Sequence, residues 1–142
     1  MPASAFTTRV AVRWGDIDRL GHVNHVSIVE YFQEARAVFL RTGGMTTHVA
    51  VRTLTLDFAH PLTDHDHGVT VTVTVTVLGT GRTSFTIEQH ALDTDGRRCA
   101  RATAVLVALD PETHTARPLL PQERAHLDAY LHRSEDRPST VG

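Results

Sequence analysis

The chain has 142 residues, of which 41% are hydrophobic and 21% are charged, as expected for a globular protein with a sizeable core. A formal net charge of -2 without a basic stripe gives no sign of nucleic-acid binding. No apolar run approaches the roughly 18 residues that cross a bilayer, and the first ten residues lack the pattern of a signal peptide. The single cysteine, Cys99, excludes an intrachain disulfide framework. We therefore expect a cytoplasmic protein that binds neither nucleic acid nor membrane.

Residues 6–14 begin the ordered part of the chain with an alternating pattern. Val10, Val12 and Trp14 fall on one face of this segment, which predicts a half-buried strand. A loop over residues 15–23 is expected to follow, because glycines punctuate it.

A long helix is predicted immediately after the loop. Asn24 is a good N-cap residue, and Thr42-Gly43-Gly44 is expected to end the helix, since glycine readily takes the left-handed cap conformation. Between them the apolar positions recur with helical spacing, at Ile28, Tyr31, Phe32, Ala35, Val38 and Phe39. These positions cover more than a narrow stripe, so we expect the helix to be well buried.

Strand patterns dominate the rest of the chain. They are predicted over residues 49–59, 69–78, 83–93 and 98–109. In the second of these strands valine and threonine alternate, so we expect one buried face and one face that is wet or used for association. Gly79-Thr80-Gly81 indicates a turn or bulge, and Asp95-Gly96 is a hairpin signal.

A short second helix is predicted over residues 121–133, with Pro121 near its first position. One helix cannot bury the apolar faces of five strands unless the sheet curls round it. The sequence therefore predicts an α+β fold, with one long central helix wrapped by a curved antiparallel sheet. We expect residues 1–133 to form a single domain and residues 134–142 a flexible tail.

The junction between loop and long helix has the chemistry of a hydrolytic site. Two acidic residues, Asp16 and Asp18, precede the turn at residues 21–24, after which the helix begins. A helix start offers free backbone N–H groups and the positive end of the helix dipole, and both favour developing negative charge. A carboxylate beside such a start is a candidate catalytic group.

This junction is part of a longer motif. It reads Asp16-x-Asp18-x-x-Gly21-His22-Val23-Asn24, followed by Tyr31-Phe32 and Glu34-Ala35-Arg36. Further matching positions are His60-Pro61-Leu62, Leu78-Gly79, Ser84 and the final stretch from Ala102 to Pro118-Leu119-Leu120-Pro121. Over residues 8–122 the chain resembles the 4-hydroxybenzoyl-CoA thioesterase family of hotdog-fold proteins. The resemblance implies an acyl-CoA thioesterase that hydrolyses a CoA or carrier-protein thioester without metal or redox cofactor, at sites built between the subunits of a dimer or tetramer.

The same resemblance assigns the catalytic groups. Asp18 takes the position of the catalytic carboxylate, which acts either as nucleophile or as general base. Thioester hydrolysis develops negative charge on the carbonyl oxygen, and the family stabilises it with backbone N–H groups at the helix start. Here this position falls at or near His25, through its main chain and not its imidazole. Asp16 is expected to bond loop N–H groups, and Arg36 to pair with a carboxylate such as Asp16 or Asp18.

Four further residues are candidates for substrate contact. His22 either orients the substrate or packs within the loop, and Asn24 either caps the helix, which we favour, or positions a water. Ile28 replaces the tyrosine common in the family, which implies a smaller, wholly apolar wall of the acyl pocket. Arg82 either contacts the CoA phosphates or is an ordinary exposed turn residue.

Two other functions are alternatives to thioester hydrolysis. A hotdog dehydratase or hydratase would need an Asp-x-Asn-Pro-type motif, which the chain lacks. A binding module that holds acyl groups without turnover is an alternative that the sequence leaves open. A metal site at His65-Asp66-His67 is not expected, since a polar turn explains these residues better and no second ligand pair is evident.

Overall fold

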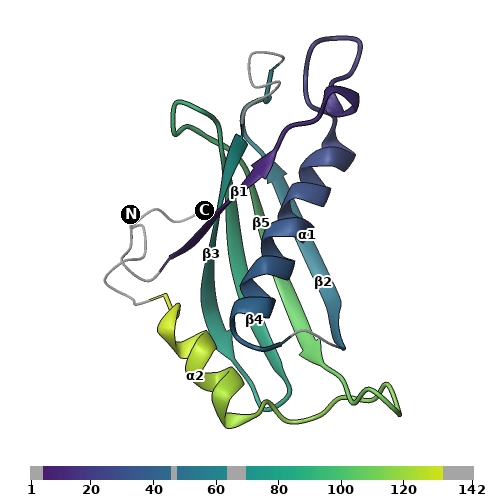
Figure 1. Cartoon of the computed structure of the whole chain (residues 1–142), viewed down its shortest axis with the longest axis vertical. Coiled ribbons are helices and arrows are strands. Elements are labelled where there is room, and N and C mark those ends of the chain that lie inside the picture. Colours follow the sequence, from purple (N-terminus) through teal and green to yellow (C-terminus); the bar gives the residue numbers. More distant parts are fainter. Residues whose placement is uncertain (1–4, 46–47, 64–69, 133–142) are drawn as a thin grey trace.

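Five antiparallel strands form one sheet in the order β1-β3-β4-β5-β2 (Figure 1). The strands are β1 (Phe6–Ala11), β2 (Val49–Phe58), β3 (Thr70–Thr80), β4 (Ser84–Leu92) and β5 (Arg98–Ala108). The computed structural model describes residues 5–45, 48–63 and 70–132. The predicted tail over residues 134–142 and the His65-Asp66-His67 turn therefore lie outside the described residues.

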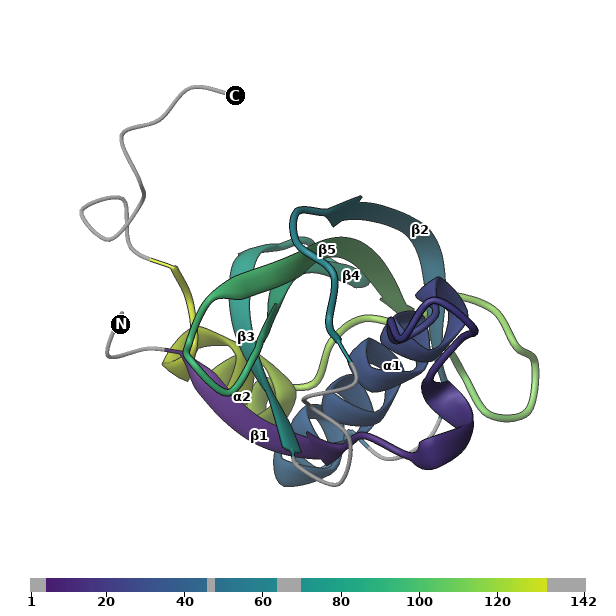
Figure 2. The same cartoon turned by 90° about the horizontal axis from the view of Figure 1, so that it is seen from above.

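The long helix α1 (His25–Thr42) lies along one face of the curved sheet (Figures 1 and 2). Its buried residues are Ser27, Ile28, Tyr31, Phe32, Ala35 and Phe39. The apolar positions predicted from helical spacing are thus confirmed as the buried side, with Val38 only partly covered. The α+β prediction is confirmed, but α1 is not the only helix of the described chain, because α2 (Pro121–Ala129) packs beside it at one end.

Both predicted ends of α1 are confirmed. The Asn24 side chain accepts a hydrogen bond from the Ser27 N–H group at 2.8 Å, which caps the first turn. At the other end Gly43 is the C-cap residue, and Gly44 has a φ angle of 73°. That left-handed conformation strains most side chains, so glycine is favoured there.

The alternation predicted for β3 is also confirmed. Its inward valines, from Val71 to Val77, are fully buried. The threonine face is less wet than expected, because Thr74 and Thr76 are buried as well. The pairing with β4 shifts register between Val77 and Gly79, which is the predicted bulge.

One prediction about the first strand is wrong. Trp14 does not share a buried face with Val10 and Val12; β1 ends at Ala11, and the Trp14 side chain is 77% exposed. The chain turns instead into a short 3-10 helix over Trp14–Asp16, where the Asp16 carboxylate accepts the Arg13 N–H group at 3.0 Å. This local capping interaction competes with the alternating pattern and ends the strand.

The second helix ends earlier than predicted, at Ala129 instead of residue 133. The chain leaves α2 to pair with β3: the Val77 N–H group donates to the Tyr130 carbonyl at 2.9 Å, and the His132 N–H group donates to the Val77 carbonyl at 2.7 Å. Strand-like pairing therefore replaces the last predicted turn.

α2 is fastened to the end of α1. The His126 imidazole is hydrogen-bonded through Nε2 to the Phe39 carbonyl at 2.9 Å, and its ring lies 4.6 Å from the Phe39 ring and 5.4 Å from the Tyr130 ring, centroid to centroid. The same imidazole lies directly over Gly43. Neither helix in the described ranges is long and apolar enough to cross a membrane.

Candidate active site

The Asp18 carboxylate lies on an exposed loop that leads into α1. Its Oδ1 atom accepts the backbone N–H groups of Leu20 at 2.9 Å and His22 at 3.1 Å. The Asp18 N–H group donates to the His22 carbonyl at 2.7 Å, which closes the loop on itself. The N–H group of His22, and then that of Leu20, holds the pKa of the Asp18 carboxyl below its usual value. Asp18 is therefore ionised at neutral pH, as a base or nucleophile must be.

The start of α1 has two backbone N–H groups with no acceptor among the described residues. The Asn24 side-chain oxygen accepts the Ser27 N–H group at 2.8 Å, and the Asn24 carbonyl accepts the Ile28 N–H group at 3.2 Å. The N–H groups of His25 and Val26 come before these in the first turn, where a helix supplies no intrahelical acceptor. They are available to an oxygen atom from outside the chain.

A hollow opens beside this helix start, at the end of β2. It is lined by Val23, His25, Ile28, Phe58, Ala59, His60 and Pro61. The His25 imidazole stacks on the Phe58 ring, with 4.5 Å between the centroids and 27° between the planes. Ile28 is buried at 3% exposure. The hollow is therefore lined mainly by apolar side chains and borders His25, the first residue of α1.

Asp16 joins the loop to α1. Its Oδ2 atom accepts the Arg13 N–H group at 3.0 Å and the Tyr31 hydroxyl at 2.5 Å, and its Oδ1 atom accepts the Ser27 hydroxyl at 3.1 Å. Burial alone would raise the pKa of the Asp16 carboxyl, but the hydrogen bonds from Tyr31, Arg13 and Ser27 outweigh it and lower the pKa. The prediction that Asp16 accepts a loop N–H group is confirmed by the bond from Arg13. The bonds from Ser27 and Tyr31 of α1 were not predicted.

The predicted pairing of Arg36 with Asp16 or Asp18 is wrong. The Arg36 Nη1 atom instead donates to the Gln89 Oε1 atom at 3.4 Å, and Gln89 in turn donates to the Phe32 carbonyl at 2.9 Å. Arg36 faces β4 from the fourth turn of α1, whereas the two aspartates lie beyond the helix start. Burial lowers the pKa of the Arg36 guanidinium.

The other predicted contact residues are not all brought together. His25 and Ile28 line the hollow, but His22 and Asn24 do not. Asn24 caps α1, and His22 pairs through its backbone with Thr63.

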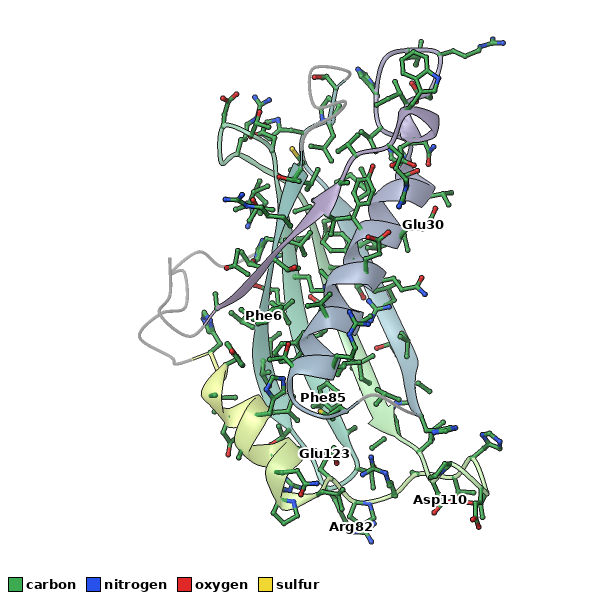
Figure 3. All side chains as sticks on the ribbon, in the orientation of Figure 1. Phe6, Glu30, Arg82, Phe85, Asp110 and Glu123 are labelled. Carbon is green, nitrogen blue, oxygen red and sulfur yellow. The ribbon has the colours of Figure 1, made fainter. Side chains whose placement is uncertain are left out.

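Arg82 lies at the end of the molecule opposite the start of α1, as the label positions of Glu30 and Arg82 show (Figure 3). The carbonyls of Gly81 and Arg82 accept the Arg124 guanidinium at 2.9 and 3.2 Å, so this turn is tied to α2. A single chain therefore does not place Arg82 near the hollow.

Several residues of this region were not predicted as site residues, among them Ser27, Tyr31, Phe58 and His60. The alternation of β2 places Phe58 on the same face as Leu54 and Leu56, which is a signal that it points inward. No sequence pattern indicates a polar partner for the Tyr31 hydroxyl, because helical spacing predicts only that the ring is buried.

Comparison with known families identifies the chain as a thioester hydrolase. The model of the Thioesterase-like superfamily matches residues 12–131, and the chain belongs to this family. No curated protein sequence matches the chain significantly.

Solved structures of thioesterases have the same fold. A Thermus thermophilus thioesterase complexed with coenzyme A and Zn is 29% identical, with 93% of this chain and 95% of that chain covered and a TM-score of 0.74. A predicted thioesterase from Bacillus stearothermophilus is 22% identical, with 91% and 98% covered and a TM-score of 0.79. A 1,4-dihydroxy-2-naphthoyl-CoA thioesterase from Synechocystis is 17% identical, with 94% and 99% covered and a TM-score of 0.76. The last two show the hotdog-type fold alone.

Proposed function

We propose that this protein hydrolyses acyl-CoA thioesters, or the corresponding carrier-protein thioesters, with Asp18 as the catalytic carboxylate. The observation that supports this most directly is the helix start, where the N–H groups of His25 and Val26 have no acceptor among the described residues and lie beside an apolar hollow. Such donors can stabilise the oxyanion that forms when the thioester carbonyl is attacked. The Asp18 loop leads directly into this helix start.

The reaction needs only these groups and water. Either Asp18 removes a proton from water, which attacks the carbonyl carbon, or the Asp18 carboxylate attacks first and water cleaves the resulting anhydride. In both routes the carbon–sulfur bond breaks, the sulfur leaves as a thiolate that takes up the proton lost by the attacking water, and the acyl group is released as a carboxylic acid. The backbone N–H group of His25 would bind the carbonyl oxygen throughout.

The substrate class follows from the relatives and from the hollow. The coenzyme A bound to the Thermus thermophilus thioesterase supports a CoA thioester. The walls formed by Ile28 and Phe58 fit an apolar acyl group. Contacts from His22, Asn24 and Arg82 remain part of the proposal, and Arg82 would reach the site only from a second copy. Membership of the narrower 4-hydroxybenzoyl-CoA family and the cytoplasmic location stay predictions.

A panel of acyl-CoA esters with thiol detection tests the function. We expect the purified protein to release free CoA thiol from at least one aliphatic or aromatic acyl-CoA, with turnover that saturates with substrate. Tight acyl-CoA binding without thiol release would support the acyl-binding alternative. Interconversion of enoyl- and hydroxyacyl-CoA without thiol release would support the dehydratase alternative.

Self-association is part of the proposal, because β2 is an edge strand with an incompletely covered inner face. Val51, Leu54 and Phe58 are 44%, 39% and 43% exposed. An unpaired edge with exposed apolar side chains is a surface on which another strand can pair. A second copy of the chain would cover this surface and complete the hollow at its Phe58 end.

Leu54→Arg is therefore expected to shift the protein from dimer to monomer in light scattering, with loss of most activity. Thr55→Arg is the matched control, because the neighbouring side chain is exposed on the other face of β2. If Leu54→Arg and the wild type have the same molar mass in light scattering, the inner face of β2 is not the contact between subunits. The molar mass of the wild type also separates a dimer from a tetramer.

A further inference from the structure

The buried carboxylate of Asp16 holds together segments that are distant along the sequence. Asp16 is 7% exposed, and Tyr31 is completely buried. A buried carboxylate is costly unless several donors satisfy it. Here one donor comes from the turn before Asp16 (Arg13), one from the first turn of α1 (Ser27) and one from the second turn (Tyr31).

Asp16 also determines how the helix is capped. Its carbonyl oxygen accepts the Asn24 N–H group at 2.9 Å and the Asn24 side-chain Nδ2 at 3.2 Å. Because Nδ2 is held in this way, Oδ1 of the same amide is turned toward the Ser27 N–H group. The position of Asp16 therefore directs the cap to the N–H group of Ser27, and those of His25 and Val26 have no acceptor among the described residues.

Asp16 and Asp18 are separated only by Ile17, which pairs with Val23 across the loop. A displacement of Asp16 would therefore move the Asp18 carboxylate relative to the start of α1. The Tyr31 hydroxyl, at 2.5 Å from the Asp16 Oδ2 atom, is the contact that anchors this carboxylate deepest in the helix.

We propose that Tyr31 is a positioning residue for thioester hydrolysis: through Asp16 it fixes the Asp18 loop at the distance from the helix N–H groups that the reaction needs. This inference rests on the proposed function. Tyr31 does not line the hollow. Its effect is expected on turnover more than on substrate affinity, since a misplacement of about 1 Å can cost on the order of 10²-fold in rate.

Tyr31→Phe tests the inference, because it removes the hydroxyl and keeps the ring. We expect kcat per folded protein to fall by about ten- to a hundredfold, on the scale of such misplacements, with KM nearly unchanged. Tyr130→Phe is the matched control: it removes the hydroxyl of a ring that packs on Phe6 and Phe39 at the other end of α1, and it should keep the wild-type kcat. A wild-type kcat for Tyr31→Phe, or a rise in KM alone, would overturn the inference.

A second measurement does not depend on activity. In amide NMR spectra we expect Tyr31→Phe to shift the signals of Leu20, His22 and His25 and to speed their hydrogen exchange, while Tyr130→Phe leaves them unchanged. If the wild type hydrolyses no thioester, the proposed function fails, but the link from Tyr31 to the loop is still tested. Unchanged signals in Tyr31→Phe would refute that link whatever the activity.

Discussion

Replacing Asp18 with asparagine is expected to slow thioester hydrolysis by about 10²–10⁴-fold, the range that loss of a general base produces. The asparagine side chain keeps an oxygen that can accept the N–H groups of Leu20 and His22, so the loop should hold its shape. What is lost is the negative charge that attacks the carbonyl or activates water. The measurement is kcat/KM for the best substrate of the acyl-CoA panel.

Asp18→Ala provides the comparison, because alanine removes both the charge and the loop contacts. Equal losses in the two variants would assign the effect to chemistry, whereas a loss in Asp18→Ala alone would leave Asp18 with a purely structural role. Asp128→Ala, which removes an exposed carboxylate of α2, should have wild-type activity. Since the N–H groups of His22 and Leu20 lower the pKa of Asp18, the acid limb of the wild-type profile due to Asp18 is expected at a lower pH than an ordinary aspartate would give.

Gly43→Ala is expected to lower the free energy of unfolding. Among glycine-to-alanine changes at the described glycines that lack a positive φ angle, this loss should be the largest. A Cβ atom at this position would lie well inside van der Waals contact of the His126 ring. The imidazole has little freedom to withdraw, because it is bonded to the Phe39 carbonyl and packed between aromatic rings. Overpacking of this kind costs about 1–3 kcal/mol, and thermal unfolding should show a lower Tm by several degrees.

Gly15→Ala is the control for this prediction, because a Cβ atom there meets nothing within 4 Å. A second test uses the background His126→Ala, in which the clash is removed. If the contact is responsible, Gly43→Ala should cost much less free energy of unfolding in that background. Equal costs in both backgrounds would contradict the proposed contact.

Much of the fold could be predicted because the deciding interactions are local or periodic. The cap at Asn24 depends on residues three positions apart, and the valine alternation of β3 sets its buried face without reference to other strands. The alternating pattern misplaces Trp14 for a related reason. The alternating pattern continues through it, but the Asp16 carboxylate, two residues later, captures a backbone N–H group and turns the chain.

The parts of the site that could not be predicted depend on contacts between distant segments. Arg36 meets Gln89 across 53 positions, and no periodicity indicates which polar partner a half-buried guanidinium will find. The hollow needs the end of β2 beside the start of α1, and the Phe58–His25 stacking fixes this only in three dimensions. The Asp18 and His25 assignments rested on family resemblance, and their roles stay predictions.

The bond between Tyr31 and Asp16 has a consequence for the pH range in which the protein works. Burial, and then the adjacent Asp16 carboxylate, raises the pKa of the Tyr31 hydroxyl above its ordinary value, while the pKa of Asp16 is lowered. The hydroxyl therefore keeps its proton in alkaline solution, and the carboxylate stays ionised in mildly acidic solution. The hydrogen bond between Tyr31 and Asp16 should therefore be the same in mildly acidic and in alkaline solution. Any change of the hydrolysis rate near neutral pH then comes from the titration of a group outside this pair.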